Sequence, residues 1–323
     1  MAVEGEGRSF TLVRTPDGDR DAWLDQRRKG VGGSDVAAIM GLSPWRSVYQ
    51  TWAEKSGLTE AEDISGRPSV VWGNILEPIV GEHYAEGHGD RTVRRVNAVC
   101  RSIERPWAQA SLDYEVKDPE LGWGVLEIKT AGLRSAPEWE EGVPLFYQAQ
   151  VVHYMSVTGR PFADVAVLIG GQDYREYRIM RDEDDIRAVD KAVDDFWGMV
   201  QTGLEPPVGP GDGPALFSRH REPDGEVAQL DETPYELSRY LAAKRSHDAA
   251  RELLDATKNQ LCSLVGDRSG FTCPDGKVTW ARAKGRRLDT KALKRDHPDL
   301  CERYTVETDR NMGIRFSATK GKR

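Results

Sequence analysis

The stretch from Leu112 to Thr130, LDYEVKDPELGWGVLEIKT, constrains the fold more than any other part of this chain. A turn rich in Pro, Gly and Asp separates two segments that we interpret as neighbouring antiparallel strands. Because side chains alternate along a strand, Glu127 and Lys129 share one face, and the apolar Leu126 and Ile128 share the other. We expect the apolar pair to pack against a helix layer and the charged pair to lie on an open face.

The same hairpin predicts that Asp113 lies close to Glu127. Two carboxylates at a few ångströms repel each other and raise each other's pKa, which is costly unless a cation lies between them. Oxygen ligands of this kind suit Mg²⁺ or Mn²⁺, and a lysine beside the metal can act on a water or on a phosphate. The alternative interpretation is a solvated sheet face, where Glu-x-Lys patterns are common.

Composition limits the class of protein. The chain has 323 residues, 38% hydrophobic and 30% charged, which is typical of a globular protein with one large domain and a smaller appendage. No apolar run approaches the roughly 18 residues that a membrane helix needs. The N-terminus lacks the pattern of a signal peptide, and the four cysteines form no Cys-x-x-Cys pair. We therefore expect a cytoplasmic protein with reduced thiols, no membrane contact and no zinc knuckle.

Charge is uneven along the chain. The net charge is -8, but residues 281–323 contain 13 Lys+Arg and 6 Asp+Glu, a net of +7, so the other 280 residues carry -15. An acidic protein can still bind DNA through a local basic surface and bound cations. The basic tail is either such a surface or a solubilising one.

The order of predicted elements indicates a mixed central β-sheet flanked by helices, with a small C-terminal α+β appendage. Residues 205–214 (EPPVGPGDGP) cannot sustain a helix or a central strand, which places a linker at 205–232 between domains 1–204 and 233–323. No nucleotide-binding glycine motif is present. We predict helices over 21–30, 34–40, 47–56, 70–84, 144–158, 182–202 and 234–265, and strands over 92–103, 107–114, 124–129, 163–169 and 174–180, with further short strands around Asp275 and a last strand pair near the C-terminus.

Asp113 followed by Glu127-Ile128-Lys129 resembles the active-site signature of the PD-(D/E)xK nucleases, which have a restriction-endonuclease-like core. Leu112 replaces the proline of that signature. The surrounding 130 residues or so resemble one branch, the YqaJ-like viral recombinases related to phage lambda exonuclease. The matching segments are RKGVGGSD (28–35), GLSPW (41–45), WGNILEP (72–78), ASLD (110–113) and YQAQVVHY (147–154).

The resemblance implies a site residue by residue. Asp113 and Glu127, with the main-chain carbonyl of Ile128, would hold a Mg²⁺ ion (or Mn²⁺), and Glu77 would reach a second ion. Lys129 would position the attacking water. The remaining two residues of this set lie on the 144–158 helix: Gln150 would orient Lys129 or the water, and Tyr154 would support the same helix face.

A second group of residues would bind the DNA end. The resemblance implies that Arg28, Ser34 and Ser111 form a pocket for the terminal 5′-phosphate, with Ser34 at a helix N-terminus and glycines 32 and 33 allowing close approach of the backbone. The alternative is a simple helix N-cap, at Gly33 or Ser34, with a surface arginine nearby.

The family resemblance implies a metal-dependent exonuclease that degrades linear double-stranded DNA from the 5′ end. It leaves a 3′ overhang for a single-strand annealing protein in phage recombination, in the cytoplasm of a bacterial host. A homo-oligomeric ring is expected. Two alternatives remain open: an endonuclease of the same fold, and a non-catalytic protein that binds DNA ends. For the C-terminal unit we expect its 234–265 helix to pack on the nuclease, another subunit or a partner, with the basic run 282–295 as a possible phosphate contact.

Overall fold

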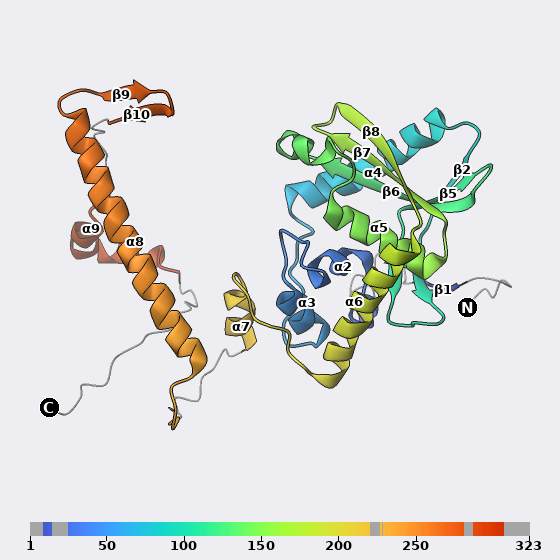
Figure 1. Ribbon diagram of the computed structural model, residues 1–323, viewed down its shortest axis with the longest axis horizontal. Coiled ribbons are helices and arrows are strands. Elements are labelled where there is room, and N and C mark those ends of the chain that lie inside the picture. Colours follow the sequence, from blue (N-terminus) through green and yellow to red (C-terminus); the bar gives the residue numbers. More distant parts are fainter. Residues whose placement is uncertain (1–8, 15–24, 220–226, 228, 281–286, 307–323) are drawn as a thin grey trace. The chain divides into compact units, whose positions relative to one another are not determined.

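The computed structural model describes residues 9–14, 25–219, 227, 229–280 and 287–306 (Figure 1). The chain divides into two compact units, Met1–Glu222 and Pro223–Arg323. Four predictions fall wholly or partly outside the described residues: the start of the 21–30 helix, the later part of the 205–232 linker, the first part of the basic run 282–295, and the last strand pair.

A five-stranded mixed sheet forms the centre of the first unit, with the order β2-β5-β6-β7-β8. Strands β6 and β7 are parallel, and the other neighbours are antiparallel. The predicted mixed α/β architecture is therefore confirmed. The strands are β2 (Thr92–Arg95), β5 (Tyr114–Asp118), β6 (Gly122–Ala131), β7 (Phe162–Ile169) and β8 (Asp173–Met180).

Helices cover both faces of this sheet (Figure 1). Helix α4 (Pro68–Gly87) buries Val80 and Tyr84 against Leu126 and Ile128 of β6. A helix was predicted to cover this apolar face of β6. The other face is covered by α5 (Leu145–Thr158), which packs in turn on α6 (Glu183–Thr202). The prediction of an open face is thus wrong: Glu127 is only 2% exposed. Helix α5 is apolar on most sides because it lies between the sheet and α6.

The strands predicted over 92–103 and 107–114 are not continuous in the structure. Residues 92–103 form two strands that belong to different sheets, because β2 pairs with β5 while β3 (Val99–Ser102) pairs with β4 (Gln109–Ser111) and β1 (Phe10–Val13). Residues 107–114 are likewise divided between β4 and β5. The break falls at Leu112 and Asp113, so Asp113 stands at a junction between the two sheets and outside either strand.

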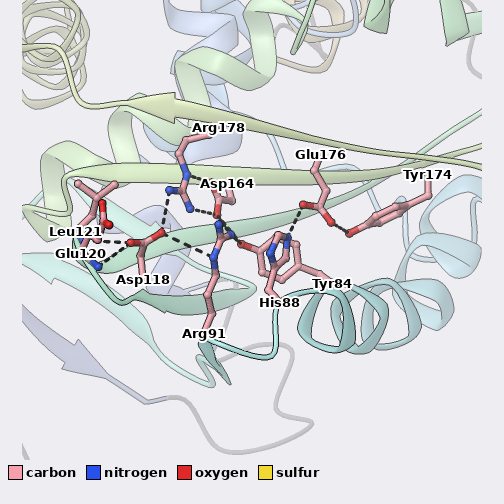
Figure 2. A network of polar contacts seen from close by, with 10 residues as sticks. All are labelled: Tyr84, His88, Arg91, Asp118, Glu120, Leu121, Asp164, Tyr174, Glu176 and Arg178. Carbon is pink, nitrogen blue, oxygen red and sulfur yellow. Dashed lines mark hydrogen bonds and ion pairs between the residues drawn. The ribbon is translucent and has the colours of Figure 1, made fainter.

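An ion network fixes the end of the β5–β6 hairpin (Figure 2). Asp164 of β7 is buried and accepts hydrogen bonds from Arg178 (2.7 and 2.8 Å), from the Tyr84 hydroxyl (2.5 Å) and from Arg91 (3.2 Å). Arg178 also donates to Asp118 at 2.9 Å, at the end of β5.

The Asp118 carboxylate closes the turn that follows it. It accepts the main-chain N–H groups of Glu120 and Leu121 at 3.0 and 3.2 Å. The Glu120 N–H, Arg178 and the Leu121 N–H lower the pKa of Asp118 to about 2. The hairpin that carries the Glu127 strand is therefore fastened to β7, β8 and the region after α4.

The first part of the predicted 205–232 linker is an ordered part of the first unit. Residues 205–219 lie in the first unit and include helix α7 (Gly213–Arg219). Asp212 is fully buried and accepts a hydrogen bond of 2.5 Å from Ser47, the N-cap of α3 (Val48–Lys55). Gln50 of α3 donates to the Gly211 carbonyl at 3.1 Å. The glycines and prolines here form an ordered loop on α3, and the unit boundary falls later, after residue 222.

The second unit contains one long helix with small elements after it. These are α8 (Tyr235–Val265), the hairpin β9 (Gly270–Cys273) and β10 (Gly276–Thr279), α9 (Thr290–Asp296) and α10 (Pro298–Arg303). Leu253, Leu254 and Leu264 of α8 are exposed within this unit. Among the described residues, none of the helices has the length and apolar character needed to cross a membrane.

Candidate active site

Asp113 and Glu127 lie side by side, as the hairpin predicted. The Asp113 carboxylate accepts the main-chain N–H of Ile128 at 2.9 Å, one residue beyond Glu127. Burial raises the pKa of Asp113. Burial, and then the charge of Asp113, raise the pKa of Glu127 to about 8. The two carboxylates therefore form a site with excess negative charge, which favours a cation or a proton.

Lys129 lies two residues after Glu127 on β6, on the face of the strand that α5 covers. Its ammonium donates to Glu127 Oε1 at 2.6 Å and to Gln150 Oε1 at 3.2 Å, and lies 4.7 Å from the centre of the Tyr147 ring. Burial lowers the pKa of Lys129, but Glu127 and Asp113 outweigh it, so the pKa lies above its usual value. Lys129 is therefore a charged donor in this site, not a neutral base.

Helix α5 supplies the other side of the site. The Gln150 amide donates to Glu127 Oε1 at 2.7 Å and to the Tyr154 hydroxyl at 2.9 Å. Gln150 and Tyr154 are neighbours on one helix face because they are four residues apart. The structure thus brings together Glu127, Lys129, Gln150 and Tyr154. Sequence reasoning missed Tyr147, although its spacing of three residues before Gln150 places it on the same face.

Glu77 projects from α4 and is paired with Arg95 of β2 at 2.7 Å. Burial, followed by the charge of Asp113, raises the pKa of Glu77, which places its carboxylate within electrostatic range of the other two. Arg95 was not singled out from the sequence. Arg95 can be recognised as a neighbour of the site only when the pairing of β2 with β5 is known. That pairing places Arg95 opposite Tyr114, the residue after Asp113.

The predicted phosphate pocket is only partly assembled. Ser34 accepts a hydrogen bond from Arg27 at 3.3 Å, whereas Arg28 is half-exposed and forms a long ion pair with Asp25 at 3.8 Å. Ser111 is exposed at the end of β4. The expected N-cap is also wrong. Helix α2 (Gly33–Ile39) is capped at Gly32, whose N–H donates to the Asp35 carboxylate at 3.0 Å.

A cluster of charges around the buried Asp35 lies next to Ser34, because its member Arg27 also bonds the Ser34 hydroxyl. Asp35 is 1% exposed and is paired with Lys55 at 2.7 Å, Arg27 at 3.4 Å and Arg46 at 3.9 Å. Burial alone would raise the pKa of Asp35, but the three cations outweigh it and hold this pKa well below its usual range. Sequence reasoning did not identify this cluster, because its members come from three separate segments.

Gly33 fits helix α2 tightly against α5. A Cβ atom at Gly33 would lie 2.4 Å from the Tyr154 ring and 2.8 Å from Gln150 Cγ. The glycine predicted to approach a phosphate thus has a packing role against the active-site helix.

We expect Gly33→Ala to destabilise the protein by about 1–3 kcal/mol, because the methyl group must displace Tyr154 or the α2 backbone. It should also lower activity by shifting Gln150. Thermal unfolding and activity measured together check this. Gly132→Ala is the matched control, since a Cβ there meets no atom within 4 Å. Equal effects of the two substitutions would contradict the packing role.

The donor chemistry of the site fits a hard divalent cation. Oε2 of Glu127 is buried and has no hydrogen-bond partner among the described residues. It lies beside a second carboxylate, and a buried acceptor without a partner is a natural metal-binding atom. Among the described residues, no three His, Cys, Asp or Glu side chains converge as a ready-made metal cluster. Glu77 is instead held by Arg95.

The comparisons with known proteins identify the family. The family model described as YqaJ-like viral recombinase domain matches residues 22–161. The chain is 31% identical to the YqaJ protein of Bacillus subtilis over 318 residues, which is 95% of this chain and 98% of that protein. The chain belongs to the YqaJ-like viral recombinase family. The family match spans every site residue discussed above, from Arg27 to Tyr154.

Two further similarities are more limited. A segment of 65 residues is 40% identical to protein D345L of African swine fever virus, and covers 20% of this chain and 18% of that protein. An alkaline exonuclease of Laribacter hongkongensis, of known crystal structure, is 24% identical with a TM-score of 0.47. That match covers 57% of this YqaJ-like chain and 93% of the exonuclease.

Proposed function

We propose that this protein is a metal-dependent exodeoxyribonuclease that degrades one strand of linear double-stranded DNA from its 5′ end. The 3′ single-stranded overhang that remains would be the substrate of a single-strand annealing protein in phage recombination. One observation supports the metal site on which the proposal depends; the 5′ polarity and the 3′ overhang rest on the family resemblance. The buried Glu127 carboxylate is bonded on Oε1 by Lys129 and Gln150, and keeps Oε2 without a partner among the described residues, beside Asp113. A solvated sheet face, the alternative interpretation, does not bury such a group.

The residues of the site suggest how a metal would be held. Asp113, Glu127 and the main-chain carbonyl of Ile128 would bind Mg²⁺ or Mn²⁺, and Glu77 would leave Arg95 to bind a second ion. When bound, such ions supply Lewis-acid stabilisation of the attacking and leaving oxygens of the phosphodiester. Glu77 would contribute to this only as an ionised carboxylate. Burial and the charge of Asp113 raise its pKa, and a bound cation would favour the ionised form.

Lys129 would act as a charged donor. An ammonium has three N–H groups, and two are directed to Glu127 and Gln150. The third would donate to the attacking water or to a phosphate oxygen, where a fixed positive charge stabilises the charge that develops. Gln150 would hold the Lys129 ammonium and the Glu127 carboxylate in fixed positions. Its amide oxygen accepts from Lys129, and its amide nitrogen donates to Glu127.

The proposal is tested by digestion of linear duplex DNA that carries a 5′-phosphate or a 5′-hydroxyl, beside closed circular DNA. Loss of linear DNA with Mg²⁺, abolished by chelation and by Lys129→Ala, would support it. Cutting of the closed circle would replace it by an endonuclease. Cleavage of no substrate with either Mg²⁺ or Mn²⁺ would leave a non-catalytic protein that binds DNA ends.

The 5′-phosphate pocket has its own prediction. Arg28 is half-exposed and, among the described residues, forms one long ion pair of 3.8 Å with Asp25, so its guanidinium can turn to a phosphate. We expect Arg28→Ala to reduce the preference for 5′-phosphorylated over 5′-hydroxyl ends about 10-fold, with unchanged thermal stability. Arg27→Ala is the comparison. It also removes a partner of the buried Asp35, so it should lower both the preference for 5′-phosphorylated ends and the thermal stability. An unchanged preference in Arg28→Ala would exclude Arg28 from the pocket.

The expected partners follow from the proposed reaction. A single-strand annealing protein would take the 3′ overhang, and a homo-oligomeric ring would hold the enzyme on its duplex. The exposed leucines of α8 offer a surface for either assembly. The expected place of action is the cytoplasm of a bacterial host that carries the phage or prophage.

A further inference from the structure

Trp45 is an exposed aromatic side chain on a rigid turn. Its side chain is 68% exposed, in the segment between α2 and α3. The Ser43 hydroxyl accepts the main-chain N–H groups of both Trp45 and Arg46 at 3.2 Å, which fixes this turn locally. A large apolar ring held out in this way loses little conformational entropy when it binds a ligand.

A row of rings connects Trp45 with the active site. The Trp45 ring lies edge-on to Phe146, with centroids 5.0 Å apart, and Phe146 lies 4.4 Å from Tyr147. The Tyr147 ring in turn lies 4.7 Å from the Lys129 ammonium. Trp45 is therefore a fixed, exposed platform at the outer end of a row that ends at a proposed catalytic group.

The residue that follows Trp45 in the sequence carries a positive charge. The adjacent Arg46 is partly exposed and is paired with Glu54 at 2.5 Å and with Asp35. The charges of this region are close to balanced, because Asp212 bonds Ser47 nearby and Glu138 lies within electrostatic range of Tyr147. An exposed apolar ring next in sequence to a partly exposed guanidinium matches a ligand that combines a flat ring with an anionic group.

We propose that the Trp45 indole stacks on the nucleobase of the 5′-terminal nucleotide of the strand that is degraded. This inference rests on the proposed nuclease function and adds a contact to its substrate. Stacking on a nucleobase is tolerant of sequence, because every base has a flat face, and an exonuclease needs such tolerance. A second copy of the chain on this surface is one of the outcomes that the test below distinguishes.

Two measurements test the stacking. First, the Lys129→Ala protein is irradiated with a 5′-phosphorylated duplex that carries 5-iododeoxyuridine at the 5′ terminus, and the cross-linked peptide is identified by mass. We expect the peptide that contains Trp45. Second, steady-state hydrolysis is measured for Trp45→Ala and Trp45→Phe. We expect KM to rise about 10-fold in Trp45→Ala with kcat within about 2-fold, and Trp45→Phe to recover most of the loss. Leu145→Ala is the matched control, because Leu145 is a similarly exposed apolar side chain, 64%, beside Phe146.

The outcomes separate this inference from the function beneath it. Cleavage by the wild type with unchanged KM in Trp45→Ala, or with a cross-link elsewhere, would overturn the stacking alone. An equal effect of Leu145→Ala would also overturn it, since a general apolar contact would then suffice. So would a smaller particle mass of Trp45→Ala in sedimentation, because Trp45 would then lie between subunits. If the wild type cleaves no DNA, both the nuclease function and this inference fail.

Discussion

Replacing Glu127 by glutamine is expected to lower DNA hydrolysis on the order of 10³-fold or more and, at the same time, to stabilise the metal-free fold. The loss of activity follows because the amide offers one neutral oxygen where the carboxylate offers two charged ones. The gain in stability follows because a glutamine oxygen can still accept from Lys129 and Gln150, while the repulsion from Asp113 disappears. Hydrolysis rates and thermal unfolding in chelator check the two effects separately.

The stabilisation should depend on pH. The pKa of Glu127 is raised to about 8 in the folded protein, against an ordinary value of 4.5. Between these values the folded state holds a proton that the unfolded state has lost, so the free energy of unfolding falls as pH rises through this window. Glutamine does not titrate, and the advantage of Glu127→Gln should therefore be small near pH 4 and largest above pH 8. A constant difference across this range would contradict the raised pKa.

Asp164→Ala is expected to cost about 3–5 kcal/mol of stability, the largest structural effect that we predict. Asp164 is 4% exposed and binds two arginines and a tyrosine, so its removal leaves their donors without an acceptor in a buried setting (Figure 2). Because Arg178 also holds Asp118 at the end of β5, activity should fall along with stability. Denaturant unfolding followed by tryptophan fluorescence measures this well, since eight of the nine tryptophans lie before residue 223.

Asp173→Ala is the matched control for this measurement. Asp173 lies on the neighbouring strand β8 and pairs with Arg175 at 2.6 Å, but its side chain is 45% exposed. Exposed pairs of this kind contribute about 0–1 kcal/mol. A loss in Asp164→Ala no greater than in the control would mean that the network is incidental to the stability of the hairpin.

Part of the site was predictable because it is local in sequence. Glu127 and Lys129 alternate on one strand, Asp113 faces them across a hairpin, and Gln150 and Tyr154 share a helix face. The order of helices and strands was enough to indicate a mixed sheet. Periodicity and turn chemistry determine such features, and they depend little on the rest of the fold.

The remaining features depend on pairing between distant segments. Nothing in residues 92–103 shows that they divide between two sheets, because each half pairs with a different later strand. The pairing of Arg95 with Glu77 and the buried charges around Asp35 arise only when these strands and helices meet. The covered face of β6 was missed because a charged pattern on a strand usually indicates solvent.

The parallel pairing of β6 with β7 has a consequence for the newly made chain. Glu127 is opposite Val165 and Lys129 is opposite Val167, so the strand that carries the catalytic groups is held in place by a strand synthesised some forty residues later. The helix between them supplies Gln150. A ribosome must therefore release the chain to beyond Ile169 before the groups can meet. If the proposed nuclease function holds, a chain built in this order would stay inert toward nearby DNA throughout most of the synthesis of its first unit.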